Sequence, residues 1–266
     1  MNNDDGLLRK WPDKSTLTGL MLALLLTTPW VGATEQPQSE SIKVSLGAGA
    51  VYAPKYSGAE EYETRAIPVL YVQYGRFTFG GVGGISYDIL KRDDLSAGIA
   101  AGYFRGRDES DSAHLQGLGD VASAVDFGGY VRKNFGQFYL AANFKRDFSS
   151  DVGGVTAGVA TGYSYQVKPQ LNLSMTLSAR WMNDTYAQAV YGITEPQALA
   201  SGLPVTSGNA GFERMTASLT TLYFINRQWI LTGNVSASRL LQDARSSPIT
   251  EDANPVVLMG SVSYRF

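Results

Sequence analysis

The chain has a single histidine, His114, which lies in a charged segment that also contains serines. Such surroundings would suit the general base of a hydrolase. Ser110, Asp111 and Ser112 precede it closely. A histidine activates a serine nucleophile when a carboxylate orients it, but such groups are brought together in space and not by adjacency in sequence. We therefore interpret His114 as a solvated loop residue, with a hydrolase base as the alternative, and we expect no catalytic residue.

Three pairs of neighbouring acidic residues, at positions 60–61, 93–94 and 251–252, could supply ligands for a divalent cation. Carboxylate oxygens are the ligands that calcium and magnesium prefer. All three pairs fall in expected loops or turns, where solvated charge explains them, and bridging by a bound calcium or magnesium ion is the alternative. No phosphate-binding loop or metal-spaced histidine pair is present. We expect no metal site and no cofactor.

The composition excludes several classes of function. The chain has no cysteine, which removes disulfides and thiolate chemistry. Its 22 basic and 24 acidic residues give a formal net charge of −2, so there is no basic surplus for a nucleic-acid partner. The 29 glycines and the charged fraction of only 17% fit strands that are half apolar.

The elements that would carry any site follow a period of two residues. In residues 170–182, apolar side chains at odd positions alternate with polar ones at even positions. The same alternation marks residues 42–52, 138–145, 155–165 and 229–238. Segments of this length cross a bilayer when tilted, with the apolar row toward lipid and a narrow lumen lined by small residues. The sequence predicts an all-β fold: a transmembrane antiparallel up-and-down β-barrel.

The number of strands must be even if both termini lie on one side of the membrane. Residues 77–90 contain glycine pairs that divide them into two short strands, which gives twelve strands, with ten as the alternative. Aromatic residues cluster near expected strand ends, as in interfacial girdles. Short connections alternate with long ones at residues 105–119, 183–211 and 241–254, as periplasmic turns alternate with external loops.

The two ends of the chain indicate export and membrane assembly. A basic start, an apolar stretch at residues 17–28 and small residues at 31–33 predict a cleaved signal peptide over residues 1–33. A periplasmic lead-in is expected at residues 34–41 and the barrel at 42–266.

The last strand ends with Tyr264 and Phe266 on its apolar row, which resembles the C-terminal signal read by the barrel-assembly machinery of bacterial outer membranes. The expected location is the Gram-negative outer membrane, with both termini periplasmic.

Two further features leave alternatives open. Five basic residues fall on or near strands, where they could pair with acidic side chains or line a narrow path: Arg65, Lys145, Arg180, Arg214 and Arg239. The longest loop, residues 183–211, carries apolar residues of its own. Such a loop is either a packed lid over the barrel or a contact surface.

Several blocks resemble the MipA/OmpV family of outer-membrane proteins, over essentially the whole mature chain. The more specific blocks consist of Ser201, Gly202, Leu203 and Pro204, and of Arg239, Leu240, Leu241, Asp243, Ala244, Ser247, Pro248 and Ile249. The resemblance implies a barrel without enzymatic activity. It also implies a scaffold that joins a lytic murein transglycosylase to a peptidoglycan synthase, as described for the founding member.

The expected partners are therefore outer-membrane lipid and lipopolysaccharide, the barrel-assembly machinery, and these two murein enzymes. Lipopolysaccharide is also what a cation bound to the acidic pairs would bridge to. A periplasmic enzyme would contact the short turns at Asn134, Lys168 and Asn226. Each turn offers little area against the roughly 800 Å² per partner of a stable interface. A partner would therefore need several turns together, or the lead-in at residues 34–41. A small channel that responds to osmotic conditions, and an adhesin that acts through the external loops, are the alternatives.

Overall fold

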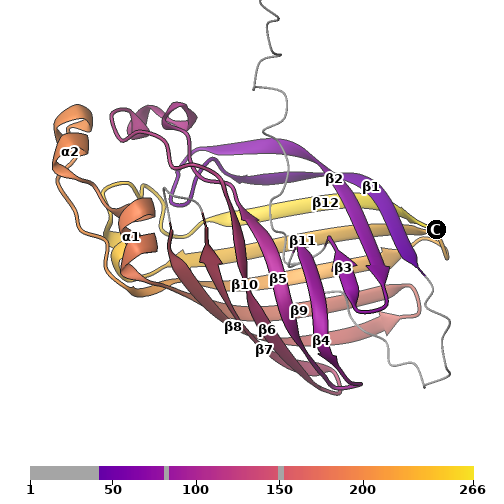
Figure 1. The fold of residues 1–266 in the computed structure, drawn as a ribbon. Helices are drawn as coiled ribbons and strands as arrows, with labels where there is room; N and C mark the ends of the chain where they lie inside the picture. The colour runs from indigo at the N-terminus through magenta and orange to yellow at the C-terminus, as the bar shows by residue number, and fades with distance from the viewer. Residues whose placement is uncertain (1–41, 81–83, 149–152) are drawn as a thin grey trace, which may run out of the picture.

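Twelve strands form one closed antiparallel barrel in the computed structural model, which describes residues 42–80, 84–148 and 153–266 (Figure 1). Strands that are consecutive in the chain pair with each other, and β1 (Lys43–Pro54) closes the barrel against β12 (Val256–Arg265). The predicted up-and-down transmembrane barrel is confirmed. The predicted signal peptide and lead-in lie outside the described residues.

The other strands follow in order around the wall. They are β2 (Tyr62–Tyr74), β3 (Phe77–Phe79), β4 (Ile85–Lys91), β5 (Leu95–Phe104), β6 (Ala124–Phe135), β7 (Phe138–Asp147), β8 (Val155–Lys168), β9 (Leu171–Met182), β10 (Gly211–Phe224) and β11 (Trp229–Leu240). Residues 77–90 divide into β3 and β4, so the prediction of twelve strands is confirmed and ten is excluded.

Short helices lie in the long loops. They are the 3-10 helices η3 (Glu109–Asp111) and η4 (Ala113–Leu115) and the α-helices α1 (Asp184–Tyr191), α2 (Glu195–Ser201) and α3 (Gln242–Ser246). Within the described ranges, no helix has the length and apolar character needed to cross a membrane.

An apolar belt covers the outer surface of the barrel. Met175 and Leu177 on β9 are 60% and 62% exposed, and Leu140, Phe144 and Val159 are more than half exposed. These side chains stand on alternate positions of their strands and therefore on one face of the sheet. A belt of this extent is stable against hydrocarbon and not against water.

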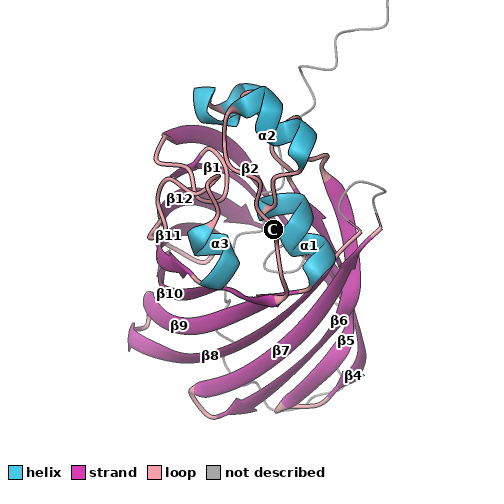
Figure 2. Ribbon diagram, turned by 90° about the vertical axis from the view of Figure 1, so that its left-hand side faces the viewer, coloured by secondary structure: helices cyan, strands magenta, loops and turns pink. Residues whose placement is uncertain are grey.

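The loops divide the barrel into two unlike ends. The turn end holds the short connections and the end of β12, where aromatic rings gather: Tyr264 lies 5.2 Å from Trp229 and 4.9 Å from Phe266 between ring centroids. The predicted aromatic clustering near strand ends is confirmed. The opposite end, which we name the cap end, holds the long loops and their helices (Figure 2).

Inward-facing glycines leave room for large side chains that lie along the inner surface of the barrel wall. Tyr139 is buried over Gly162, where an added Cβ would lie 2.2 Å from the Tyr139 Cε1 atom. The Tyr139 hydroxyl is within 3.0 Å of the Thr176 Oγ1, and the Arg132 guanidinium lies 3.7 Å from the ring centroid. Position 162 therefore requires glycine because the Tyr139 ring occupies the space of a side chain, and not because of the backbone conformation there.

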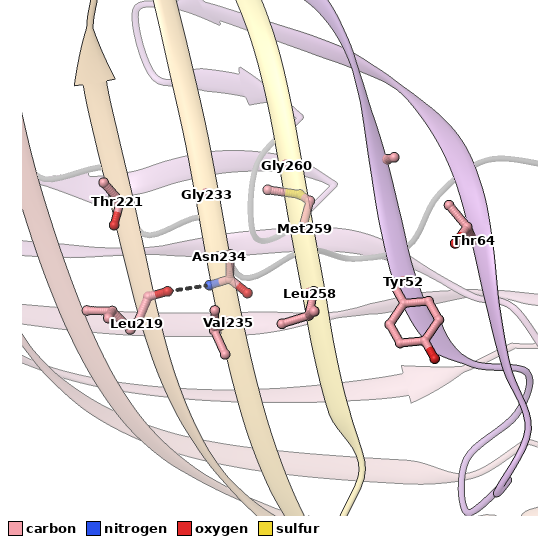
Figure 3. Close-up of a pocket in the computed structure, with 11 residues that line it drawn as sticks. Tyr52, Thr64, Leu219, Thr221, Gly233, Asn234, Val235, Leu258, Met259 and Gly260 are labelled. Carbon is pink, nitrogen blue, oxygen red and sulfur yellow. Dashed lines mark hydrogen bonds between the residues drawn. The ribbon is translucent and has the colours of Figure 1, made fainter.

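The outward-facing Gly233 and Gly260 have no such role. Gly233 and Gly260 are register partners in a shallow depression of the lipid-facing surface, beside Val235, Leu258 and Tyr52 (Figure 3). An added Cβ at either glycine would meet nothing within 4 Å. These two positions therefore tolerate larger side chains.

We predict that Gly162→Leu destabilises the barrel and that Gly233→Leu does not. Overpacking of an interior position typically costs about 1–3 kcal/mol, whereas Gly233 faces open space. The measurement is the urea midpoint of the folded, heat-modifiable gel band after reconstitution in detergent. Equal midpoints for the two variants would show that Gly162 is not constrained by Tyr139.

Candidate functional site

A buried carboxylate, Glu213, lies where the cap meets the barrel wall. The register of β10 against β9 shifts between Phe212 and Arg214, which is a β-bulge. Phe212 and Met215 both face outward, so the two residues between them face inward together. The bulge places Glu213, with no exposed surface, beside Arg214 at the inner mouth of the barrel.

Three side chains neutralise and hold this carboxylate. The Arg180 Nε lies 3.0 Å from Glu213 Oε2, and the Arg214 Nη2 lies 2.6 Å from Oε1. The Tyr191 hydroxyl donates a 2.8 Å hydrogen bond to Oε1. A buried charge is stable only when it is paired and hydrogen-bonded, so these contacts are mutually dependent. We name Arg180, Tyr186, Tyr191, Glu213 and Arg214 the Glu213 cluster.

The Glu213 cluster ties helix α1 to the barrel and to the neighbouring loops. Arg180 donates to the Tyr186 hydroxyl at 2.8 Å, and the Tyr191 hydroxyl lies 2.8 Å from the Ser57 Oγ of the β1–β2 loop. Burial raises the pKa of both tyrosines, so both stay neutral donors and acceptors at neutral pH. The loop between β1 and β2 is thus fixed to α1.

Two other loops bond to the backbone of α1. The buried Arg107 of the β5–β6 loop donates from Nη1 to the Val190 carbonyl at 3.0 Å. The Ser247 hydroxyl of the β11–β12 loop donates to the Tyr191 carbonyl at 2.7 Å. Burial lowers the pKa of the Arg107 guanidinium. Three loops that are distant in sequence therefore meet at one helix of a fourth loop, the one between β9 and β10.

Apolar side chains complete this cap. One cluster consists of Met182, Tyr186, Ala187, Val190, Tyr191, Leu240 and Ala244, and the other of Tyr56, Ala59, Leu115, Leu118, Ile193 and Ile249. The long loop 183–211 is thus a packed lid, in agreement with the first of its two interpretations.

The helices of this lid are not predicted by the alternation of the sequence, although their capping signals are present. The Asn183 Oδ1 accepts from the Tyr186 backbone N–H at 3.1 Å, and Thr194 with Gln197 forms a capping box. Gly202 ends α2 with a φ of 75°.

Most family-motif residues build the cap. Leu240, Ala244 and Ile249 have no exposed surface, and Asp243 accepts two hydrogen bonds from Asn209. In the other block, the Ser201 hydroxyl donates to the Gln197 carbonyl at 2.7 Å, Leu203 packs on the second apolar cluster, and the Pro204 carbonyl accepts from Thr206. These residues bind other parts of the chain.

Arg239 differs from the other residues of these motifs because it does not pack in the cap. It also differs from the other four predicted strand cations, which form ion pairs. Arg65 pairs with Glu63, Lys145 pairs with Asp126, and Arg180 and Arg214 pair with Glu213. Arg239 stands instead on the outward row of β11, in register with the exposed Met215. The expectation of a lumen-facing charge is therefore corrected for Arg239.

His114 is a structural link between two loops. Its Nε2 lies 2.8 Å from the Pro248 carbonyl, and its Nδ1 lies 3.8 Å from Glu251 Oε1. Tyr56 donates to the other oxygen of Glu251 at 2.8 Å. The interpretation of His114 as a freely solvated side chain is corrected, because its ring is partly buried against these groups. Among the described residues, its ring bonds to a carbonyl and not to a serine hydroxyl.

The acidic pairs considered as cation ligands have protein partners. Lys55 pairs with Glu61, Lys133 pairs with Asp94, and Tyr56 donates to Glu251. The hydrogen bond from Lys133 lowers the pKa of Asp94. In the three described ranges, no group of three or more histidine, aspartate or glutamate side chains is placed to hold a metal ion.

At the turn end, the three predicted contact residues differ in whether their side chains form hydrogen bonds within the protein. The Asn226 Oδ1 accepts from two backbone N–H groups of its own turn, each at 2.8 Å, and the Asn134 Oδ1 accepts from Arg132 at 3.0 Å. Lys168 is exposed at the end of β8, where the register shifts. Lys168 therefore has its charge available at the rim.

We predict that Glu213→Gln loosens the cap while the barrel stays folded. Removal of one partner from a buried ion pair costs about 3–5 kcal/mol, which corresponds to roughly a hundredfold or greater rise in local opening. The measurement is hydrogen exchange of the α1 backbone amides. Glu195→Gln on the exposed face of α2 is the control, and equal protection in both variants would contradict the anchoring role.

We predict that Tyr186 ionises late in an alkaline titration. Burial raises its pKa to about 12, above the ordinary value of about 10. Its contribution to stability is therefore complete below about pH 10 and is lost as pH rises from about 10 to 12. The measurement is the phenolate absorbance difference between the native protein and Tyr186→Phe. A difference with its midpoint near pH 10 would indicate an exposed α1.

Comparison with known proteins agrees with the motifs. The family model described as MltA-interacting protein MipA matches residues 46–266. MltA-interacting protein of Escherichia coli (strain K12) is 24% identical over 231 residues, which cover 84% of this chain and 90% of that protein. Putative outer membrane protein YiaT of the same strain is also 24% identical over 231 residues, covering 84% and 91%.

Among solved structures, an outer membrane channel from Pseudomonas putida F1 aligns with a TM-score of 0.43 at 13% identity, over 88% of this chain and 100% of that chain. The resemblance that the sequence blocks indicate is confirmed by the family match. Because that match extends over most of the chain, from the first strand to the last residue, the protein belongs to the MltA-interacting protein MipA family.

Proposed function

We propose that the protein is a non-enzymatic outer-membrane scaffold, which holds a lytic murein transglycosylase, and with it a peptidoglycan synthase, at the turn end of its barrel. The basic rim of the turn end carries this proposal, supported by a relative named MltA-interacting protein. In this proposal a signal peptide over residues 1–33 directs export. The assembly machinery reads Tyr264 and Phe266, and the turn end faces the periplasm.

The two ends of the barrel carry opposite charge. The rim of the turn end has two acidic residues, Asp93 and Asp94, and eight basic ones: Lys43, Arg76, Lys91, Arg92, Lys133, Lys168, Arg227 and Arg265. The cap loops at residues 55–61, 105–123, 183–210 and 241–255 have eleven acidic and four basic residues. An acidic partner surface is therefore attracted to the turn end and repelled by the cap.

The area of the turn end sets the form of the interface. Twelve strands about 4.8 Å apart and tilted by about 40° give a backbone circumference of about 75 Å. With side chains, the rim presents on the order of 900 Å², close to the roughly 800 Å² per partner of a stable interface. A partner must therefore cover most of the rim and contact turns on opposite sides of the barrel together.

A small channel is the second candidate function. The observation that favours it is an inward-facing polar wall, where Asn143 is exposed and Lys145 pairs with Asp126 at 3.1 Å. The cap lies over one mouth of this lumen and is fixed by the Glu213 cluster (Figure 2). We expect no steady conductance from the native protein in planar bilayers, and stable single-channel currents would favour the channel instead.

The scaffold is tested by photocrosslinking in intact cells. Photoreactive residues replace Gln137, Lys168 and Arg227, because these positions are exposed and leave the bonds of Asn134 and Asn226 intact. We expect all three to capture the same transglycosylase, since the partner covers the rim. The control is Leu199 on α2, which is 89% exposed at the cap end and is expected to capture none.

Capture of only assembly factors and lipoproteins at the three turns, with efficient labelling, would contradict the scaffold. Capture of a murein enzyme from Leu199 alone would place the interface at the cap and contradict the proposed orientation or face.

A further inference from the structure

An apolar groove of about 870 Å³ crosses the outer surface of the barrel from β6 to β11. Its ridges are exposed side chains, among them Leu140, Leu177 and Met215. Its floor includes Ala179, Ala217 and Ala237, with Ala217 in register with both Leu177 and Ala237. Small side chains in neighbouring strands let a chain-shaped apolar ligand approach the sheet closely.

Each end of the groove has a cation: Lys133 lies toward the turn end, where it pairs with Asp94, and Arg239 lies toward the cap. Arg239 lines the groove beside Met215, its register partner. The outward row of β11 starts at Trp229, in the aromatic cluster of the turn end, and reaches Arg239 ten residues later. At about 3.3 Å per residue and a tilt of about 40°, this row rises about 25 Å, which is the height of the apolar band of a transmembrane barrel. Arg239 therefore lies at the headgroup level opposite to the turn end.

No described acidic side chain neutralises Arg239. The acidic residues of the strands, Glu63, Asp88, Asp126, Asp147 and Glu213, all stand on inward rows. Arg146 on β7 is a second cation on an outward row near the cap end. The neighbouring motif residues are buried in the cap, so the packing of the cap does not explain the type of residue at position 239.

We propose that this groove binds acyl chains of a phosphorylated lipid of the outer leaflet, lipid A of lipopolysaccharide, with its phosphate on the Arg239 guanidinium. The apolar walls accept the acyl chains and the cation at headgroup level complements the phosphate. The proposal rests on the proposed outer-membrane location with the cap outside. It does not rest on the scaffold function, which concerns the other end of the barrel.

The test is native mass spectrometry of the full mature protein, folded in mild detergent and mixed with purified hexa-acylated, bisphosphorylated lipid A. Loss of a charge-assisted contact predicts that Arg239→Ala retains lipid A about tenfold less. Ala217→Phe, which fills the groove floor, is expected to reduce retention similarly, whereas Arg239→Lys retains most of it. All variants are compared after heat-modifiability confirms that the barrel is folded.

Two matched controls locate the effect. Arg146→Ala removes an outward cation that does not line the groove, and Gly233→Leu adds bulk in the separate depression near β12. Both are expected to retain lipid A as the native protein does. The variant pair K168E and R227E, which addresses the scaffold, is also expected to leave retention unchanged.

Equal retention in the native protein, Arg239→Ala and Ala217→Phe would overturn the proposal. It would also be overturned if phosphatidylglycerol displaced lipid A at equal concentration, or if the groove variants changed only dimer formation. The last result would assign the groove to a second copy of the chain.

Discussion

The ion pairs of Glu213 are the constraint on which the arrangement of the cap depends. A carboxylate without exposed surface requires Arg180, Arg214 and Tyr191 in fixed positions. Tyr191 belongs to α1, and α1 in turn receives bonds from the β5–β6 and β11–β12 loops. A bulge in one strand thus determines how four loops close one mouth of the barrel (Figure 1).

Because the cap closes one end of the barrel, the lateral surface and the turn end are the surfaces left for binding. The lateral surface is apolar and meets lipid, with Arg239 as a cation at its border. The turn end has short connections and a surplus of basic residues, so its chemistry is that of an electrostatic docking face. The proposed scaffolding at one end and the proposed lipid recognition on the side are therefore compatible with the same rigid barrel.

The barrel, its strand number and its aromatic rows could be predicted because period-two alternation is a local property of each strand. The cap could not, because its bonds join residues far apart in sequence, such as Ser57 with Tyr191 and His114 with Pro248. Position 213 carries no local sign that a bulge will turn it inward beside Arg214. The outward direction of Arg239 follows from the alternation of β11. The groove that it borders could not be predicted, because it depends on the register of several strands.

The proposed binding of a murein transglycosylase to the basic rim can be measured directly with the barrel held in lipid nanodiscs. In nanodiscs both ends of the barrel are accessible to a partner. Biolayer interferometry then compares the binding affinity at several salt concentrations. We predict binding that weakens as salt screens charges beyond about 8–10 Å and that is lost when Lys168 and Arg227 are both replaced by glutamate. Binding that is unchanged by these substitutions, yet lost in Glu213→Gln, would contradict docking at the rim and assign recognition to the cap.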